Sequence, residues 1–423
     1  MGAMNDRMGD FVAVLAHERP RPHTPRLVDG VDERLLEDIR NAPDDEGPRL
    51  VWADAVGGER GELVVIQLDL ERGGLSPREV IARKKRQRQL LAQHGAEWSG
   101  LEGIARRVSF ARGFVDAAEI AAPQFLAQAD DIAQAAPLLS SLTATNLRAD
   151  GPAADPIPLL SRLCADPVTR ELRGLELSCE THDQIFGRAP GELAVEILVR
   201  SGMLGRLRAL GSRDVLRMPG IRALGSPRAL HGIERLWLSE VSDADAMHAL
   251  LAAGLPALRS LDLGTQCPVA PVAHLLPPNL TELFGADDLA ALAKTAVAAQ
   301  LEHVTLERGI AGRELAAFPR LRALAIPHLD KNFHDAPALR ELAITGVMHQ
   351  PQIRTLATVL GGQLELLDLR NNGSALRFVN EIKTNVAGEL LVGSASVGRR
   401  TRSGLLRVGR TVQRSWWDHV TLG

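Results

Sequence analysis

The feature that most constrains this sequence is a leucine pattern that recurs along most of the chain. Six-residue segments of the form Leu-x-x-Leu-x-Leu, with occasional Ile or Val in place of Leu, begin at residues 172, 233, 258, 301, 321, 339 and 364, and a shortened copy begins at residue 280. From residue 233 onward, successive starts are 25, 22, 21, 20, 18 and 25 residues apart. Because no single unit of this size can cover its own apolar face, neighbouring units have to stack against one another.

This spacing brackets the period of leucine-rich repeats, about 20–29 residues. We therefore predict an α/β fold, a leucine-rich-repeat solenoid whose short strands form a parallel horseshoe sheet over residues 101–385, in about eight to ten units. The repeats should be irregular, because only Asn372 occupies the place of the Asn that normally follows the strand. The segments Leu207–Leu210 and Ile221–Leu224 cannot both be strands at this period, and the pattern does not choose between them.

Residues 31–100 carry apolar positions at helical rather than strand spacing. Leu35, Leu36 and Ile39 predict one helix, a second opens at Leu50, a third begins near Glu62, and a fourth follows Ser76-Pro77 and ends at His94-Gly95. Residues 1–30 have several prolines and no sustained hydrophobic period, which predicts a mobile arm.

The helical part resembles a known family on specific residues. The string from Leu35 to Asp54 (LLEDIRNAPDDEGPRLVWAD), then Arg60-Gly61-Glu62-Leu63 and Ile66-Gln67-Leu68, is similar to the bacterial repeat-companion domain, a short helical module that accompanies leucine-rich repeats. The resemblance continues through residues 94–98 and 110–115, and departs from the family at Ala55-Val56. It implies a helical module preceding the repeats, and it implies no catalytic residues.

Composition limits the class of protein and the cellular compartment to be expected for this chain. The 423 residues are 45% hydrophobic with a formal net charge of -3, which is ordinary globular composition and excludes a dedicated nucleic-acid coat protein. The three cysteines, Cys164, Cys179 and Cys267, are far apart and favour neither a disulfide framework nor a zinc site. No signal-like start and no run of eighteen apolar residues is present, so we expect a cytoplasmic protein without a membrane partner.

Catalytic and metal-binding motifs are missing from the sequence. It has no phosphate-binding glycine loop, no zinc-protease motif and no nucleophile elbow. His328, His334 and His349 match no metal-ligand spacing, and the acidic residues Asp44, Asp45, Glu46 and Asp54 are better explained as helix N-terminal charge than as paired catalytic carboxylates. We therefore predict no catalytic residues, no metal, no cofactor and no enzymatic activity.

Candidate binding residues follow from the alternation of side chains along a strand. The middle residue of each strand core points away from the leucines, so these residues should lie together, exposed, on the concave face. Trp237 and Phe284 are conspicuous there in a chain with 3% aromatic residues, either as anchors for a protein partner or merely as cover for the sheet. The predicted contacts on this face are Glu176, Trp237, Asp262, Phe284, Thr305 and Asp368.

Two further segments could contact partners. The basic run Arg83–Arg88 and the C-terminal arginines could contact phosphates. A charge run is usually a solvated helix face, however, and no aromatic residues are interleaved for base stacking, so nucleic acid is not favoured. Residues 386–423 contain two strand-like segments, residues 388–393 and 404–409, and end near Trp416 and Trp417. They form either a cap for the solenoid or a docking segment.

The sequence therefore predicts a non-enzymatic scaffold or adaptor that binds a protein partner, whose identity it does not reveal, on the concave face of a solenoid. Trp416 and Trp417 are second-rank contacts. The alternative is a structural subunit of a larger assembly, attached through its Arg- and Trp-rich C-terminal segment. The pattern leaves the oligomeric state open.

Overall fold

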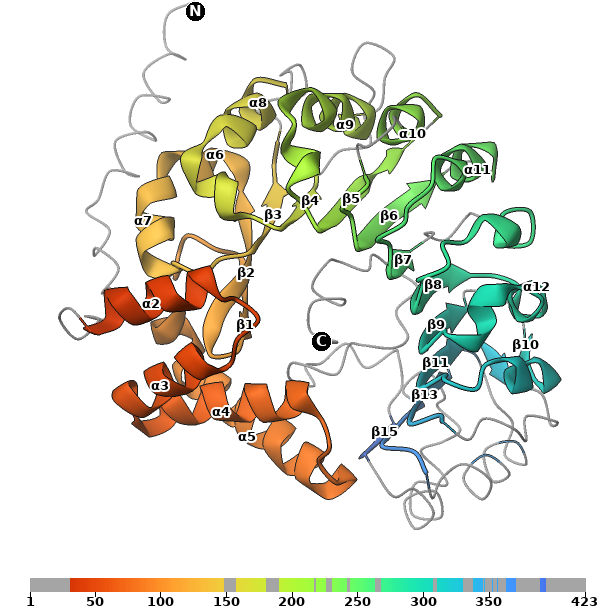
Figure 1. Cartoon of the computed structure of the whole chain (residues 1–423), viewed down its shortest axis with the longest axis horizontal. Helices are drawn as coiled ribbons and strands as arrows, with labels where there is room; N and C mark the ends of the chain where they lie inside the picture. The colour runs from red at the N-terminus through yellow and green to blue at the C-terminus, as the bar shows by residue number, and fades with distance from the viewer. Residues whose placement is uncertain are drawn as a thin grey trace, which may run out of the picture.

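The computed structural model forms an arc in which strands line the inner side and helices the outer side (Figure 1). It describes residues 31–147, 157–179, 190–216, 218–225, 230–241, 244–262, 268–306, 310–329, 338–344, 346, 352, 356, 363–369 and 389–392. The predicted arm over residues 1–30, most of residues 386–423, and the predicted contacts Trp416 and Trp417 lie outside the described residues.

The described part of the chain begins with four helices, as predicted: α2 (Val31–Asn41), α3 (Gly47–Val56), α4 (Gly58–Arg72) and α5 (Pro77–Ser99). Helix α5 starts at a capping box, in which Ser76 and Glu79 satisfy each other's backbone N–H groups. It continues through the predicted stop at His94-Gly95 and ends at Gly100, whose φ of 61° is the left-handed conformation that commonly terminates helices. Helix α4 begins four residues before the predicted Glu62, because Gly57 and Gly58 already provide the turn after α3.

The helices pack tightly because small residues lie where they meet. A Cβ atom on Gly61 would lie 2.4 Å from the carbonyl oxygen of Ala53, so only glycine allows α4 to approach α3 this closely. Trp52 of α3 is thereby placed against Phe114 of the sheet, with ring centroids 4.6 Å apart. Helices α2, α3 and α4 thus share one apolar cluster with Phe114 at the start of the sheet, and α5 packs on α4 through a second cluster that contains Leu90.

A tight hairpin joins the helices to the sheet. Strands β1 (Arg107–Ala111) and β2 (Phe114–Ala121) are antiparallel, and Arg112 and Gly113 between them have φ values of 50° and 85°, as a two-residue hairpin turn with both angles positive requires. Gln67 of α4 holds this hairpin, because its amide donates to the Phe110 carbonyl (2.9 Å) and accepts from the Gly113 N–H (2.6 Å). Its side chain is buried.

The main sheet contains 13 strands among the described residues, and all are parallel except β1. After β2 the order follows the chain through β3 (Ser141–Thr145), β4 (Gly174–Leu177), β5 (Ala209–Leu216), β6 (Arg235–Val241), β7 (Ser260–Asp262), β8 (Glu282–Ala286), β9 (His303–Leu306), β11 (Ala323–Ile326), β13 (Glu341–Ile344), β14 (Leu366–Leu369) and β15 (Glu389–Val392). A separate pair joins β10 (Ile310–Ala311) to β12 (His328–Leu329).

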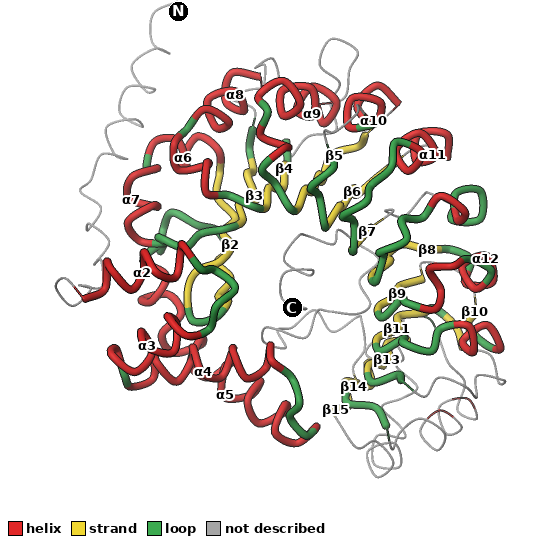
Figure 2. The backbone as a smooth tube through the Cα atoms, in the orientation of Figure 1, coloured by secondary structure: helices red, strands yellow, loops and turns green. Residues whose placement is uncertain are grey.

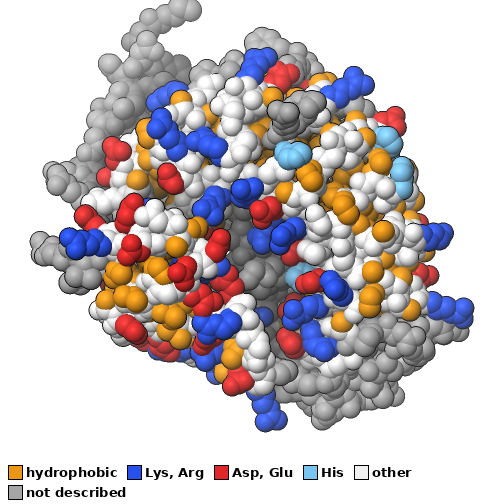
Figure 3. Space-filling view, viewed as in Figure 1, with side chains coloured by type: hydrophobic (Ala, Val, Ile, Leu, Met, Phe, Trp, Pro, Cys, Tyr) orange, Lys and Arg blue, Asp and Glu red, His pale blue; other side chains and the backbone are white. Residues whose placement is uncertain are grey.

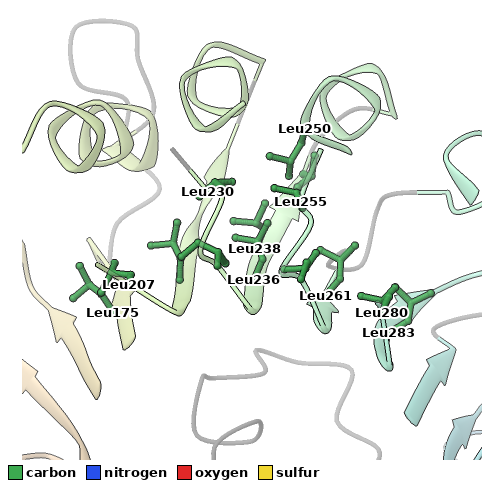
Figure 4. Packing of buried hydrophobic residues seen from close by; sticks show 14 of the residues in the cluster. Leu175, Leu207, Leu230, Leu236, Leu238, Leu250, Leu255, Leu261, Leu280 and Leu283 are labelled. Carbon is green, nitrogen blue, oxygen red and sulfur yellow. The ribbon is translucent and has the colours of Figure 1, made fainter. Parts of the chain in front are cut away.

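The repeated leucines form the core that this sheet covers (Figure 4). Pairing registers such as Leu175 to Leu210, Leu236 and Leu261 place equivalent leucines side by side, and each of these four side chains is at most 2% exposed. Strands about 4.8 Å apart bring such residues into direct contact, so the core is continuous from one repeat to the next.

The return segments on the outer side change along the chain (Figure 2). Early units return through the α-helices α6 (Ala122–Ala127), α7 (Ala129–Ala135), α8 (Ile157–Ala165), α9 (Pro190–Ser201), α10 (Met218–Leu224) and α11 (Ala244–Ala252), with short 3-10 turns η1 (Pro167–Glu171) and η2 (Met203–Gly205). Later units use η3 (Ala273–Leu275), α12 (Leu289–Ala293), η4 (Ala296–Ala299) and η5 (Arg313–Ala317). A helix about 10 Å wide behind strands about 4.8 Å apart forces the sheet to curve.

These features identify the fold as a leucine-rich-repeat solenoid preceded by helices, as predicted. The choice left open by the sequence is settled, because Ala209–Leu216 forms β5 whereas Ile221–Leu224 lies within α10. The main sheet contains 12 parallel strands among the described residues, more than the predicted eight to ten units, because β2 and β3 carry Ala118 and Ala144 where the leucine pattern was sought.

The predicted C-terminal segment, residues 386–423, contributes one strand to the main sheet. The strand expected near residue 388 is present as β15, which pairs in parallel with β14, from Leu366 opposite Glu389 to Leu369 opposite Val392. Its Glu-Leu-Leu-Val sequence retains the strand alternation even though the full leucine pattern is lost.

Candidate functional site

The predicted concave residues lie in one row across the sheet, which we call the mid-strand row. Strand pairing places Glu176 opposite Gly211, Gly211 opposite Trp237, Trp237 opposite Asp262, and Asp262 opposite Phe284. On the later strands, Thr305 is opposite Ala325, Ala325 opposite Ala343, and Ala343 opposite Asp368. The structure thus brings all six predicted strand residues together on one face.

These side chains are buried, whereas the sequence predicts that they are exposed. Trp237 is 4% exposed and Phe284 6%, yet neither belongs to the leucine core, which occupies the other face of the sheet. Glu176, Asp262, Thr305 and Asp368 are also buried. Strand alternation establishes the face on which a residue lies, but the contacts of its side chain determine how exposed it is. Asp262, Phe284 and Asp368 each take part in further interactions.

The position of Trp237 depends on a glycine in the adjacent strand. A Cβ atom on Gly211 would lie 3.1 Å from Trp237 Cε3 and 3.1 Å from Glu176 Cγ. The two large side chains therefore meet over the only residue type that leaves room for both. The indole of Trp237 is accordingly fixed against the sheet.

A charged network occupies the start of the mid-strand row. Arg213 Nε lies 3.0 Å from Glu176 Oε1, and its Nη2 lies 3.2 Å from Glu119 Oε2. Thr143 donates its hydroxyl hydrogen to Glu176 Oε2 at 2.7 Å. Burial opposes the charge on Arg213, but the charges and hydrogen bonds of Glu176 and Glu119 dominate and raise the pKa of Arg213. Around the central opening, side chains of both charge signs are visible (Figure 3).

Glu119 and Arg213 are absent from the residues predicted as contacts. Glu119 lies in the same row as Glu176, because strand pairing places Glu119 opposite Thr143 and Thr143 opposite Glu176. Arg213 lies two residues after Gly211 on β5. Because side chains two apart on a strand share a face, the period of two could have placed Arg213 near Glu176. Glu119 was missed because β2 lacks the leucine pattern.

A second polar group lies one row away, at the start of the strands. Pairing places Arg235 opposite Ser260, Ser260 opposite Glu282, and Glu282 opposite His303. Glu282 Oε1 is 3.4 Å from His303 Nδ1. Burial favours the neutral form of Glu282, but its interactions with His303, Ser260 and Arg235 dominate and lower its pKa to about 2. The carboxylate is thus held in its charged form.

Other candidates from the sequence have structural roles in the described residues. The Asp45 carboxylate accepts from the Gly47 N–H (2.9 Å) at the start of α3, and Glu46 pairs with Arg72. In the basic run, Arg83 lies 2.8 Å from Asp69 and Arg86 2.6 Å from Glu62, so two of its positive charges are compensated locally.

No cluster of three or more His, Cys, Asp or Glu side chains that could hold a metal ion is present in the part of the chain that the structure describes. A cavity of about 620 Å³ lies beside η3 and α12, and five of its twelve lining residues are alanines. Its Asp288 accepts from the Ala291 N–H and caps α12. None of the described helices has the length and apolar character needed to span a bilayer.

Comparisons with known proteins give limited guidance. No protein-family model matches this chain, and no curated protein matches it in sequence. A comparison with solved structures matches the complex of Rad7 and Elc1 from yeast, whose matched chain has 13% sequence identity and a TM-score of 0.34, with 86% of this chain and 87% of that chain covered. The assignment of this chain as a leucine-rich-repeat solenoid accordingly rests on its own strand pairing and leucine core.

Proposed function

We propose that the protein is a non-enzymatic recognition scaffold that binds a protein partner through the concave face of its solenoid. The observation that carries the proposal is the pair of aromatic side chains, Trp237 and Phe284, that flank Asp262 on the side of the sheet opposite the core. Large aromatic side chains supply much of the energy of protein interfaces, and a rigid sheet lowers the ordering cost of binding.

Charge gives the partner a chemical character. Asp262 and Asp368 lie in the same row as the aromatic residues, so we expect a partner segment with basic side chains. Since the row is buried in the isolated chain, a partner that uses it has to displace the groups that cover it. Association should therefore be slower than about 10⁵ M⁻¹s⁻¹, the lower end for docking of preformed surfaces.

The N-terminal helices are part of the same proposal. We assign residues 31–100 to the repeat-companion type of module found beside leucine-rich repeats in bacterial proteins. Four helices at the expected positions, and the apolar cluster that three of them share with Phe114 at the start of the sheet, support this assignment. In this view the module closes one end of the solenoid and leaves recognition to the repeats.

The test is a pull-down from lysate, quantified by mass spectrometry, with two matched double variants of the full chain. Trp237→Ala/Phe284→Ala removes the concave aromatics, and Val51→Ala/Val65→Ala removes two exposed apolar side chains of the helices, which are 55% and 36% exposed. Loss of the same protein with the concave variant alone supports the proposal, after circular dichroism has verified folding. Retention of every captured protein, or equal loss with both variants, contradicts it.

A chain ending at Val392 tests the alternative. It keeps every described strand of the sheet and removes Trp416 and Trp417. If the captured protein is lost with this shorter chain and retained by the concave variant, attachment lies in the C-terminal segment and the protein is a fixed subunit of an assembly.

A further inference from the structure

A small cavity lies where the helices meet the first repeats, far from the mid-strand row. Its volume is about 60 Å³, and its lining includes Trp52 of α3, Arg60 of α4, Trp98 of α5, Phe114 of β2 and Gln134 of α7. With Leu36 of α2, six elements contribute to this one space. Three of the ten lining residues, Trp52, Trp98 and Phe114, are aromatic, and Arg60 is the only charged residue among them.

Two hydrogen-bond donors at this cavity lack an adequate acceptor in the described structure. Trp52 is 4% exposed, and its Nε1–H, although buried, has no hydrogen-bond partner. Arg60 makes one long hydrogen bond, from Nη1 to the Trp98 carbonyl at 3.4 Å, although a guanidinium carries five N–H donors. An unsatisfied buried donor is costly, so these groups favour an acceptor placed between them.

The guanidinium of Arg60 is held by rings instead of by a carboxylate. Its central carbon lies 5.0 Å from the ring centroid of Trp98, 5.5 Å from that of Phe110 and 5.9 Å from that of Trp52. Arg60 forms no ion pair within the described residues, and burial lowers the pKa of Arg60 to about 10, with only a partial opposing effect from the charge of Glu97. Cation–π contacts satisfy the faces of the guanidinium but leave its N–H edges free.

We propose that this cavity is a binding site for one carboxylate, held by the Arg60 guanidinium and the Trp52 indole N–H. A carboxylate is planar, accepts at two oxygens and matches the fork of an arginine. A single positive charge in the lining balances one negative charge, which favours a carboxylate over a doubly charged phosphate. Gln134 also lines the cavity, and its side chain is exposed.

The arrangement depends on the close packing of α3 and α4. Gly61, next to Arg60, allows the close approach of α3 and α4 that brings Trp52 and Arg60 to the same cavity. Packing of Arg60 against the rings alone supplies no hydrogen-bond acceptor to the Trp52 N–H. The unpartnered indole N–H beside the unpaired cation is the observation that points to a ligand.

The experiment is an NMR titration of the full chain with ¹⁵N-labelled tryptophan indoles. The chain has 5 Trp residues, and Trp52→Phe, which keeps a ring and removes the N–H, assigns the Trp52 signal. Sodium acetate is added at pH 7 against sodium chloride of equal ionic strength. We expect a saturable downfield shift of the Trp52 signal with a dissociation constant on the order of millimolar, as a ligand of this size permits.

Variants separate binding from folding. Arg60→Gln should weaken acetate binding by about tenfold or more, because it removes charge-assisted hydrogen bonds, whereas Arg106→Gln, at a side chain that is 69% exposed, should leave it unchanged. Arg60→Lys keeps the charge and removes the fork, so an intermediate loss in a folded protein supports the same geometry. A Trp52 signal that responds equally to acetate and chloride overturns the proposal.

A second titration identifies the source of the carboxylate. The probe is the capped tripeptide N-acetyl-Ala-Glu-Ala-amide, whose only carboxylate is a side chain. Binding of both probes supports recognition of an acidic residue of a protein, and binding of acetate alone supports a free carboxylic acid. Binding of neither probe overturns the proposal. The outcome is independent of the concave-face test, since no residue is shared.

Discussion

Removal of Arg213 should destabilise the protein more than removal of any exposed arginine, because Arg213 neutralises two buried carboxylates. Glu119 is 2% exposed and Glu176 is 0% exposed, while the Arg213 side chain is 20% exposed. In Arg213→Ala, both carboxylates stay in a poorly hydrated site without their common partner. Loss of one member of a buried ion pair costs about 3–5 kcal/mol.

The lower end of this range applies here. Arg213 retains some contact with water, and Arg106 Nη1 still lies 3.4 Å from Glu119 Oε1 in the variant's starting geometry. We therefore expect a loss of about 3 kcal/mol in the free energy of unfolding at pH 7. Arg106→Ala is the matched control, since it contacts the same carboxylate from a side chain that is 69% exposed, and it should cost less than about 1 kcal/mol.

The loss should also depend on pH, with a definite sign. Without Arg213, the buried carboxylates of Glu119 and Glu176 lack their common cation, so a lower pH, which favours neutral carboxylates, should reduce the deficit. The deficit relative to the wild type should therefore be smaller at pH 4.5 than at pH 7. Urea unfolding followed by circular dichroism at both pH values measures it. A deficit equal to that of Arg106→Ala, or one unchanged by pH, would refute the reasoning.

Two further predictions concern the same face. Gly211→Ala should lower the free energy of unfolding by about 1–2 kcal/mol and shift the fluorescence of Trp237, because the new Cβ would lie 3.1 Å from the indole. Gly205→Ala is the control and should not be destabilising, because its Cβ would meet nothing within 4 Å. Equal thermal unfolding of the two variants would contradict this prediction. Glu282, with its pKa lowered to about 2, stabilises the fold above about pH 4.5 and loses this contribution as the pH falls toward 2. In Glu282→Gln, the free energy of unfolding should therefore depend less on pH in that range, whereas Glu341→Gln, in the same row, should behave like the wild type. An identical pH dependence for the wild type and Glu282→Gln would rule out this prediction.

The leucine pattern predicts the fold well because each strand repeats the same local rule. It cannot by itself choose between Leu210 and Leu224, which stand in similar sequence contexts. Length decides the matter: a strand at Leu224 would leave only 12 residues before Leu236, too few for the outer return segment that every neighbouring repeat uses.

The candidate site is less predictable because it depends on contacts between distant residues. Arg213 and Glu119 are 94 residues apart, and no local spacing connects them. The alternation of a strand indicates the face on which Trp237 lies, but it does not indicate that the side chain is buried there. Trp52 and Arg60, the donors at the cavity where the helices meet the first repeats, are brought together by helix packing that depends on one glycine, Gly61.

The hairpin clamp formed by Gln67 has an evolutionary consequence. A side chain of the helical module supplies two hydrogen bonds to the backbone around the Arg112-Gly113 turn, beside the terminal strand of the sheet. If the repeats were inherited without these helices, that strand would be left uncovered, and an uncovered edge is a template for pairing with other chains. Recombination at this boundary is thus disfavoured, and gain or loss of repeats in the interior of the array is the easier route by which such a protein changes length.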